Sequence, residues 1–518
     1  RKLDLSASKK FKIPLILLME NAAAAIAREI INYIITNKIK APKILIVAGP
    51  GNNGGDGIVV GRHLLASLQQ ISITLIIIKN KSYQGDALIN YEIIKQIAKT
   101  DNRIQIVENK LSAISNYKFD IVVDAIFGTG FKGMPTGIYQ QAIQVINKLP
   151  AYKIAIDIAS GVNGDNGEVL GDAVCAHCTV TMGLLKTGLL LFPAQKYCGK
   201  IKIANLGINY TSLFQGNTFL LDPAFIKENL PLRKPNSHKG NFGSVLVVAG
   251  GDGYSGAACL TSVGALVSGA GIVRLAYPEN IKPAVEKKLT EVIKISLPST
   301  QDGSIALSAL HKIKSLVFNS TVFAIGPGLT TNQETKTLTQ QLIPSIRLPM
   351  VIDADGLNNI TTDLLLKIPR LQRTKIIITP HPGEFERLFG IKTSIVNQNR
   401  IEICRKYAQN FSLHIVLKGT PTVIGTPTGN IYINPTGNSG LAKGGSGDVL
   451  TGMIAGFLAQ GVKPEIAACL GVYLHGLSAD IAVKKKTEYS LLATDLIKTL
   501  PQAISEILTK NERIELSQ

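Results

Sequence analysis

Two glycine-rich segments of this chain each carry a carboxylate, and this combination suggests chemistry on a phosphorylated ligand. "GPGNNGGDGIVV" (49–60) contains Asp56, and "GLAKGGSGDVLTG" (440–452) contains Asp448. In the second segment, glycines lead into a predicted helix over 448–459, so their peptide N–H groups and the helix dipole form an anion hole. Asp448 can then accept a proton from a hydroxyl group that attacks the phosphate held there.

The first glycine-rich segment poses a different electrostatic problem. Asp56, Asp124, Asp157 and Ser160 stand at or near the ends of predicted strands, and the carboxyl ends of parallel strands meet at one edge of a sheet. Carboxylates this close repel one another by roughly a few kcal/mol at an effective dielectric constant of about 20. Because carboxylates and backbone carbonyls are ligands that hard cations prefer, we predict a cation beside this glycine-rich loop.

Strand-like and helix-like runs alternate along the whole chain, which indicates α/β domains built on parallel sheets. The 518 residues are too many for one ordinary domain. The alternation breaks near 210–225, so we expect a Rossmann-like αβα domain at 1–215 and a second αβα domain at 225–518. Predicted strands lie at 43–49, 73–79, 120–126 and 153–159 in the first domain and at 243–251, 320–328, 350–356, 375–384 and 414–420 in the second, with a helix at 13–34.

The first domain carries two matches to the dinucleotide-binding pattern G-x-G-x-x-G. "GPGNNG" (49–54) lies between a predicted strand and the predicted helix 58–68, and "GTGFKG" (128–133) follows another strand. A site for ordinary NAD requires an acidic residue at the end of the second strand, but Lys79 and Asn80 stand there. We therefore do not expect ordinary NAD binding, and glycines of simple tight turns remain the alternative.

The bulk composition narrows the classes of partner. The net charge is +19, but the basic residues are scattered, tryptophan is absent and no aromatic stacking platform is apparent, so we expect phosphorylated ligands and no nucleic acid. We find no apolar run long enough to cross a membrane and no secretory leader. "CAHC" (175–178) has the spacing of half a zinc site, but we favour six buried free thiols in a reducing cytoplasm.

Several segments of the first domain together resemble the NAD(P)H-hydrate epimerase domain. They are "LLMENAA" (17–23), "NNGGDG" (52–57), "VDAIFGTG" (123–130), "DIASGVNGDNG" (157–167) and "VTMGLLKTGLL" (180–190). The resemblance implies a substrate site made of Asn52, Asn53, Gly54, Gly55, Asp56, Gly128, Thr129, Gly130, Phe131, Lys132, Gly133, Met134 and Asp157. It also implies a K⁺ site at Asn53, Asp124 and Ser160, with Asp157 as the proton shuttle in epimerisation, and Lys132 replaces an arginine that is more usual in the family.

The second domain contains no G-x-x-x-x-G-K-[ST] motif, and its "GGSGD" resembles the ribokinase-like superfamily instead. "HKGNFGSVLVVAGG", "GPGL", "DADGL", "TPHPGEF" and "LKGTPTVI" narrow the resemblance to ADP-dependent NAD(P)H-hydrate dehydratases. This resemblance implies nucleotide contacts from Lys418, Gly419, Thr420, Pro421, Thr422 and Gly447. It implies hydrate contacts from Ala257, Gly328, His381 and Asp448, with Asp448 as the general base and Glu384 associated with Mg²⁺. His381, fixed between two prolines, is more readily a ligand contact than a structural histidine.

Together these features predict a bifunctional enzyme that repairs hydrated NADH and NADPH. One domain interconverts the R and S epimers, and the other dehydrates the S form with ADP and releases AMP and phosphate. We expect a cytoplasmic homo-oligomer without nucleic-acid or membrane partners. Two alternatives remain at this point: a vitamin-type kinase with a fused non-catalytic domain, and a scaffold whose first domain only binds RNA or protein.

Overall fold

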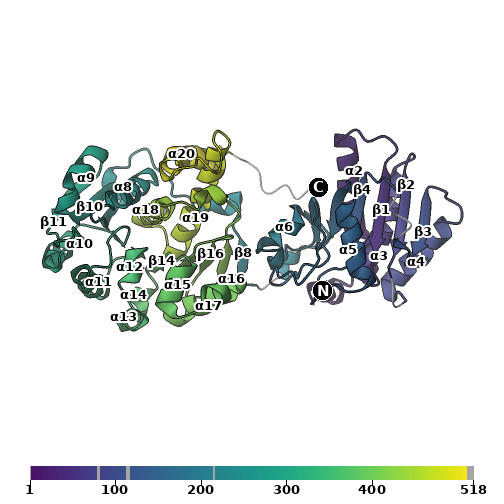
Figure 1. Cartoon of the computed structure of the whole chain (residues 1–518), viewed down its shortest axis with the longest axis horizontal. Helices are drawn as coiled ribbons and strands as arrows, with labels where there is room; N and C mark the ends of the chain where they lie inside the picture. The colour runs from purple at the N-terminus through teal and green to yellow at the C-terminus, as the bar shows by residue number, and fades with distance from the viewer. Residues whose placement is uncertain (1, 79–81, 112–116, 214–215, 510–518) are drawn as a thin grey trace. The chain divides into compact units, whose positions relative to one another are not determined.

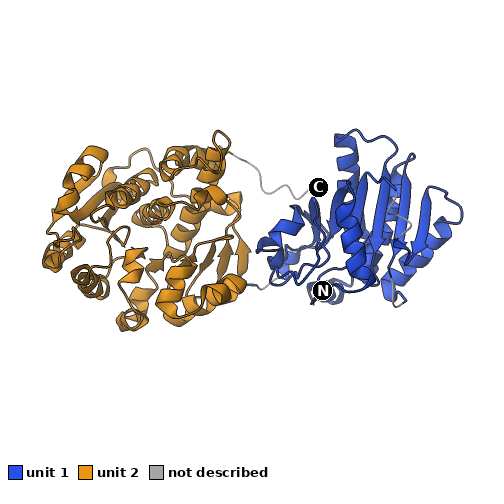
Figure 2. Cartoon of the chain, viewed as in Figure 1, with its two compact units in different colours: residues 1–216, 515–518 blue, residues 217–514 orange. Residues whose placement is uncertain are grey.

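The computed structural model describes residues 2–78, 82–111, 117–213 and 216–509. The described residues form two compact units, which Figure 2 distinguishes by colour: one lies within residues 2–216 and the other within residues 217–509. Strand β8 (Thr218–Leu220) already belongs to the sheet of the second unit, so that unit begins before residue 225. Lys79 and Asn80, on which the expectation about ordinary NAD depended, lie outside the described residues.

The first unit is a parallel sheet between two layers of helices (Figure 1). Its strand order is β3-β2-β1-β4-β5-β6-β7. The strands are β1 (Lys43–Ala48), β2 (Ser72–Ile77), β3 (Ile104–Glu108), β4 (Ile121–Ala125), β5 (Tyr152–Ile156), β6 (Cys178–Met182) and β7 (Lys200–Ala204). The helices are α1 (Lys2–Phe11), α2 (Leu15–Thr36), α3 (Asn52–Ser67), α4 (Gly85–Ile97), α5 (Ile138–Lys148) and α6 (Gln195–Cys198), with short 3₁₀ turns η2 (Thr187–Leu190) and η3 (Tyr210–Ser212).

Strand β1 shows why this sequence forms a three-layer sandwich. Ile44 and Ile46 pack into a core with α2 and α3, whereas Leu45 and Val47 pack into a second core with α5 on the opposite face. A strand buried on both faces needs apolar residues at every position, which explains the unbroken apolar run. The sheet order reverses between β1 and β4, so the loops that follow these strands form the crevice where ligands bind in such folds.

The second unit contains a ten-stranded sheet of order β11-β10-β9-β12-β13-β14-β15-β16-β17-β8. Strands from β11 to β15 run parallel, and β16 is antiparallel to both β15 and β17. The strands are β9 (Ser244–Val248), β10 (Ile272–Pro278), β11 (Ile293–Leu297), β12 (Val322–Ile325), β13 (Met350–Ile352), β14 (Ile376–Ile378), β15 (His414–Leu417), β16 (Val423–Gly425) and β17 (Ile431–Ile433). The reversal of strand order lies between β9 and β12, and the loops after the strands near it form the second crevice.

Helices cover both faces of this second sheet (Figure 1). Those that share the main apolar core are α7 (Pro223–Asn229), α8 (Ser255–Val267), α9 (Lys282–Lys288), α18 (Ser446–Ala459), α19 (Pro464–Val483) and α20 (Ala493–Thr509). The others are α10 (Leu310–Val317), α11 (Gln333–Ser345), α12 (Asp355–Asn358), α13 (Thr362–Lys367), α14 (Arg370–Arg373), α15 (Pro382–Phe389), α16 (Thr393–Gln398) and α17 (Arg400–Phe411), with 3₁₀ turns η4 (Lys239–Phe242), η5 (Glu279–Ile281), η6 (Leu307–Ala309) and η7 (Ser439–Leu441).

Helix α19 is the one described helix with the length and apolar composition of a membrane span. However, 78 % of its most apolar window is buried inside the second unit. A helix that is apolar on all sides is typical of a protein core as well as of a membrane, and α19 packs against α18 and α20. Its composition is therefore accounted for by its position in the core.

The predicted helix 13–34 corresponds to α2, and every strand named from the sequence overlaps an observed strand. The start of α3 was predicted wrongly, because the helix begins at Asn52 and not at residue 58. The reason is a close approach of backbones: a Cβ on Gly54 would lie 1.9 Å from the carbonyl oxygen of Gly49. Glycine at this position lets the first turn of α3 pack directly against the loop after β1.

Candidate functional sites

Asn53, Asp124 and Ser160, the three predicted K⁺ ligands, are linked through one loop of the first unit. The Asn53 side chain donates to the carbonyl oxygen of Phe127 at 2.9 Å, and the Phe127 N–H donates to Ser160 Oγ at 2.9 Å. Ser160 in turn donates to Asp124 through its hydroxyl (2.6 Å) and its N–H (2.8 Å). Three loops, after β1, β4 and β5, are thereby held together at the point where the strand order reverses.

The donor atoms of this network suit a hard cation. Amide, hydroxyl and carboxylate oxygens are available from Asn53, Ser160 and Asp124, and such oxygens are the ligands that hard cations prefer. Burial raises the pKa of Asp124 to about 6, although the bonds from Ser160 and Ile126 act against this shift. A cation beside Asp124 would offset the same unfavourable burial of charge, so these residues fit the predicted K⁺ site.

Asp157 follows β5 directly and is held by three hydrogen bonds. Its Oδ1 atom accepts from Thr181 Oγ1 at 3.2 Å, from the Met182 N–H at 3.2 Å and from Lys186 Nζ at 2.5 Å. Its backbone has φ of +65°, a left-handed conformation that aspartate adopts more readily than most residues. The conformation and the three donors together fix the carboxylate in one position.

A cavity of about 1000 Å³ lies over these loops. Of the residues predicted to bind the epimerase substrate, those that line it are Asn52, Asn53, Asp56, Gly128, Thr129, Gly130, Phe131 and Asp157. Leu3, Asp4 and Leu5 of helix α1 and Lys186 also line it. The cavity thus joins the glycine-rich loop, the second G-x-G-x-x-G segment and Asp157 in one candidate site.

The remaining predicted residues of this domain lie outside the cavity lining. Gly54 packs against the loop after β1, and Gly55 packs against Ala87 of α4 and Met19 of α2. Lys132 is exposed and lies 3.5 Å from the carboxylate of Asp165, and Gly133 and Met134 follow it on the surface. A role for Lys132 in place of the usual arginine stays a prediction.

Asp448 lies in the first turn of α18, in the second unit. Gly445 at the start of this helix has φ of +91°, a left-handed conformation that favours glycine, and the first N–H groups of a helix have no partners within it. Burial and the neighbouring carboxylate of Asp353 raise the pKa of Asp448 to about 6, and Lys418 opposes this shift. Asp448 is therefore positioned to exchange a proton near neutral pH, next to an anion-binding helix N-terminus.

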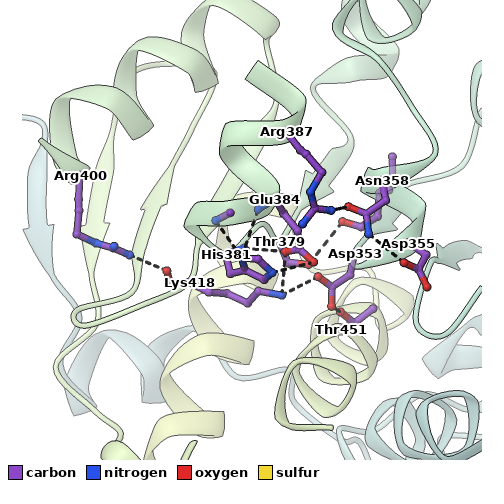
Figure 3. A network of polar contacts seen from close by, with 12 residues as sticks. Asp353, Asp355, Asn358, Thr379, His381, Glu384, Arg387, Arg400, Lys418 and Thr451 are labelled. Carbon is purple, nitrogen blue, oxygen red and sulfur yellow. Dashed lines mark hydrogen bonds and ion pairs between the residues drawn. The ribbon is translucent and has the colours of Figure 1, made fainter. Parts of the chain in front are cut away.

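Lys418 lies within a network of polar residues in the second unit (Figure 3). Its Nζ atom lies 2.8 Å from Asp353 Oδ1 and 3.6 Å from Glu384 Oε2. The other oxygen of Asp353 accepts from Thr451 Oγ1 of α18 at 2.7 Å. Burial alone would lower the pKa of Lys418, but the carboxylates of Asp353 and Glu384 raise it. Lys418 therefore remains a cation beside the start of α18.

His381 caps the N-terminus of α15, and its imidazole ring is partly exposed. Its Nδ1 atom accepts from the N–H groups of Gly383 (3.0 Å) and Glu384 (3.3 Å), and Glu384 Oε2 accepts from the His381 N–H at 2.8 Å. This capping box begins α15, while 52 % of the imidazole side chain stays exposed. Oε2 of Glu384 is engaged by this cap and lies near Lys418, and the association of Glu384 with Mg²⁺ stays a prediction.

Ala257 and Gly328, both predicted to contact the hydrate, lie together. A Cβ on Gly328 would lie 3.2 Å from Cβ of Ala257 and 2.7 Å from Cβ of Tyr254. Gly328 follows β12 and Ala257 lies in the first turn of α8, so both are at the reversal of strand order. The small residues there keep the space beside the helix open.

The predicted nucleotide-binding loop 418–422 is held from behind by Arg400. The guanidinium group of Arg400 donates to the carbonyl oxygens of Leu417 (3.1 Å), Lys418 (2.7 Å) and Pro421 (3.2 Å). Within the loop, Thr422 Oγ1 donates to the Gly419 carbonyl at 3.1 Å. Gly447 lies nearby, since a Cβ on it would lie 3.4 Å from Lys418 Nζ. The two segments predicted to contact the nucleotide are therefore adjacent.

Sequence reasoning missed three residues of these sites: Lys186, Asp353 and Arg400. Lys186 belongs to the motif "VTMGLLKTGLL" and Asp353 to the motif "DADGL". The residues that they contact, Asp157 and Lys418, lie far away in the sequence, so the motifs alone do not reveal the contacts. Arg400 belongs to no motif, and only its burial marks it. The cysteine prediction was wrong for one residue, because Cys175 is exposed while the other five cysteines are buried.

Comparison with known proteins decides which family this is. Residues 16–188 match the protein family described as YjeF-related protein N-terminus. Residues 245–502 match the protein family described as NAD(P)H-hydrate dehydratase. A bifunctional NAD(P)H-hydrate repair enzyme Nnr from Moorella thermoacetica is 39 % identical over 99 % of this chain and 96 % of its own length. The chain belongs to the bifunctional NAD(P)H-hydrate repair enzymes.

Other bifunctional NAD(P)H-hydrate repair enzymes agree with this assignment. The one from Thermofilum pendens is 36 % identical over 97 % of this chain and 94 % of its own length. A solved structure, the ADP/ATP-dependent NAD(P)H-hydrate dehydratase from Bacillus subtilis co-crystallised with ATP and Mg²⁺, is 30 % identical and covers 57 % of this chain and 100 % of that chain, with a TM-score of 0.47. The matches extend over both units, so the repair function is supported over a kinase with a non-catalytic domain.

Proposed function

We propose that the first unit interconverts the R and S epimers of hydrated NADH and NADPH, and that the second unit dehydrates the S form with ADP. The observation that best supports the second step is the position of Asp448 in the first turn of α18, beside the Lys418 cation. An anion-binding helix N-terminus and a carboxylate next to it are the two elements that phosphoryl transfer to a hydroxyl group requires.

In the dehydration step, Asp448 accepts the proton of the ring hydroxyl group. The oxygen of this hydroxyl group attacks the terminal phosphate of ADP at the same time. AMP leaves with the electrons of the broken P–O bond, and the peptide N–H groups at the start of α18 stabilise the charge on the transferred phosphate. The ring nitrogen then expels the phosphate, and loss of a proton from the adjacent carbon restores the double bond. Phosphate is a far better leaving group than hydroxide, so a kinase-like site can carry out a dehydration.

The residues assigned to each ligand remain proposals. Lys418 to Thr422 and Gly447 would contact the nucleotide, and Ala257, Gly328, His381 and Asp448 would contact the hydrate. The adjacency of Gly447 to Lys418, and that of Ala257 to Gly328, support these two groups. We propose that Mg²⁺ enters with the nucleotide phosphates, because the described residues include no group of three acidic, histidine or cysteine side chains that could hold a metal.

In the first unit, Asn52 to Asp56 and Gly128 to Met134 would surround the phosphates and ribose of the substrate, and Asp157 would transfer protons at the hydrated carbon. K⁺ held by Asn53, Asp124 and Ser160 would offset the charge of Asp124 and of the substrate phosphates. Replacing K⁺ with tetramethylammonium should slow epimer exchange and leave dehydration of the S form unchanged. Equal exchange rates in the two salts would contradict the K⁺ site.

We propose a cytoplasmic enzyme, in keeping with five buried free cysteines, which suit a reducing compartment. The expectations of a homo-oligomer and of no nucleic-acid or membrane partner stay predictions. Gel filtration with light scattering measures the oligomeric state directly.

One chromatographic assay tests the proposed function. The R and S hydrates are incubated separately with the full chain, with ADP and ATP tried in turn, and NAD(P)H, AMP and both epimers are quantified. We expect exchange of epimers without nucleotide, and conversion of the S form to NAD(P)H with release of AMP when ADP is present. Asp448→Asn should abolish dehydration and keep nucleotide binding. A stable phosphorylated product would instead indicate a kinase.

A further inference from the structure

The cavity of the first unit holds two carboxyl groups in contrasting surroundings. Oδ1 of Asp157 accepts all three hydrogen bonds described above, from Thr181, Met182 and Lys186. No N–H or O–H group among the described residues donates to the carboxyl group of Asp56, which lines the same cavity from α3 and is only 7 % exposed. A buried carboxylate without donors is costly, whereas a neutral carboxylic acid is far less so. Burial without donors therefore favours the neutral form of Asp56, whereas Asp157 is held by three donors.

The charges around Asp56 act in the same direction. Asp157 faces it from the end of β5, Lys186 from the loop after β6 and Asp4 from α1. Burial, followed by the charges of Asp157 and Asp4, raises the pKa of Asp56 well above its ordinary value, and Lys186 offsets only part of the shift. A carboxyl group with a raised pKa, close to a carboxyl group held by hydrogen bonds, suits a proton donor beside a proton acceptor.

We propose that Asp56 is the proton donor of the epimerase site and that Asp157, held by Lys186, is the proton acceptor. This inference rests on the proposed epimerase function and goes beyond it, since family resemblance assigns Asp56 only to substrate binding. Asp157 has an oxygen available for the purpose, because among the described groups all three donors bind Oδ1 and none binds Oδ2. Lys186 is then a positioning residue that holds the Asp157 carboxyl group through Oδ1.

The chemistry of the substrate defines the step. Water adds to a dihydropyridine so that the hydroxyl group lies on the carbon beside the ring nitrogen. Asp56 gives its proton to this hydroxyl as the C–O bond breaks, the nitrogen lone pair forms a C=N bond, and water leaves. A water molecule then adds to the opposite face, the C=N electrons return to nitrogen, and Oδ2 of Asp157 takes the released proton. Water then carries this proton from Asp157 back to Asp56. The reverse reaction starts with the proton on Asp157.

The test compares Asp56→Asn with the unaltered full chain. Asparagine has the shape of a neutral carboxyl group, so folding should be preserved, and ADP-driven dehydration of the S form checks the fold of the chain. We expect kcat for epimer exchange to fall by about 10²–10⁴-fold with little change in KM, as for loss of a general acid. Asp172→Asn, which alters a carboxylate bound by Gln140 and Gln144 outside the cavity lining, serves as the matched control.

The outcomes distinguish failure of the proposed epimerase function from failure of the proton-donor role of Asp56. If the unaltered chain exchanges no epimers, the proposed epimerase function is wrong. If the unaltered chain exchanges them and Asp56→Asn raises only KM, Asp56 binds substrate and the proton-donor assignment is overturned. An unchanged kcat overturns it as well.

Two further measurements test the role of Lys186 and the proposed cleavage of the C–O bond. Lys186→Gln removes one of the three donors to Asp157 Oδ1, so kcat for epimer exchange should fall with little change in KM, and an unchanged kcat overturns the positioning role of Lys186. In water labelled with heavy oxygen, enzyme-dependent exchange should place solvent oxygen in the product epimer above a blank without enzyme. Product that keeps its original oxygen overturns the proposed C–O cleavage.

Discussion

Lys418 Nζ lies 2.8 Å from Asp353 Oδ1, and this ion pair joins the loop after β15 to the loop after β13. Asp353 is 1 % exposed, and its other oxygen accepts from Thr451 of α18. Asp353 thus connects the predicted nucleotide loop to the helix that carries Asp448. Both members of the ion pair also act on the pKa of Asp448: Asp353 raises it and Lys418 lowers it.

Asp353→Asn should lower the free energy of unfolding by about 3 kcal/mol, because removing one partner of a buried ion pair leaves the other uncompensated. Thr451→Val is the matched control: it removes one hydrogen bond to Asp353 but keeps the ion pair, and should cost about 1–2 kcal/mol. Urea unfolding at neutral pH measures both variants. Equal losses would show that the ion pair contributes no more than the hydroxyl group.

Dehydration should depend on pH through Asp448. As a base Asp448 must be ionised, and with a pKa of about 6 the rate should rise with pH up to about 6 and stay level above it. Asp353→Asn removes a charge that raises this pKa and leaves Lys418 less neutralised, so the rising limb should move to lower pH. The measurement is kcat with saturating S hydrate and ADP between about pH 4.5 and 8; a limb that stays in place would count against the coupling.

His381→Asn should separate the two roles of this residue. Asparagine is a good N-cap, so the free energy of unfolding should stay within about 0.5 kcal/mol of the original value. Loss of the exposed imidazole should raise KM for the S hydrate, by about tenfold if the lost contact contributes about 1.4 kcal/mol. His381→Ala removes both the cap and the contact, and should also lower stability by about 1 kcal/mol. An unchanged KM in both variants would leave His381 with the capping role alone.

Arg400→Lys should weaken nucleotide binding even though Arg400 points at the loop from behind. Lysine keeps the charge but cannot reach three carbonyl oxygens with one planar group. We expect a loss of about 2–4 kcal/mol of stability and a higher dissociation constant for ADP, measured by unfolding and by calorimetry. Lys392→Arg, an exchange at an exposed position, is the control for altered side-chain chemistry. Unaltered ADP affinity would mean that the loop keeps its shape without Arg400.

Much of the architecture was predictable because local patterns carry it. Apolar runs predicted the strands, and polar residues at the ends of runs, such as Asp157 after β5, marked the edge that carries the candidate sites. The start of α3 was not predictable, since it depends on how closely Gly54 approaches the backbone of Gly49. Helix propensity alone disfavours a helix that begins with glycines, and tertiary packing overrides that preference.

The sequence by itself determined which segments become strands and which carboxylates stand at strand ends, because alternation, length and glycine content are local properties. Only the tertiary structure decided which charges meet. Lys186 reaches Asp157 from 29 positions away, and Lys418 reaches Asp353 from 65. These pairs exist because parallel strands end at the same edge of each sheet: β5 and β6 are neighbours, and β13 and β15 lie on either side of β14. The raised pKa values of Asp56 and Asp448 follow from that burial and those neighbours, so they are properties of the fold.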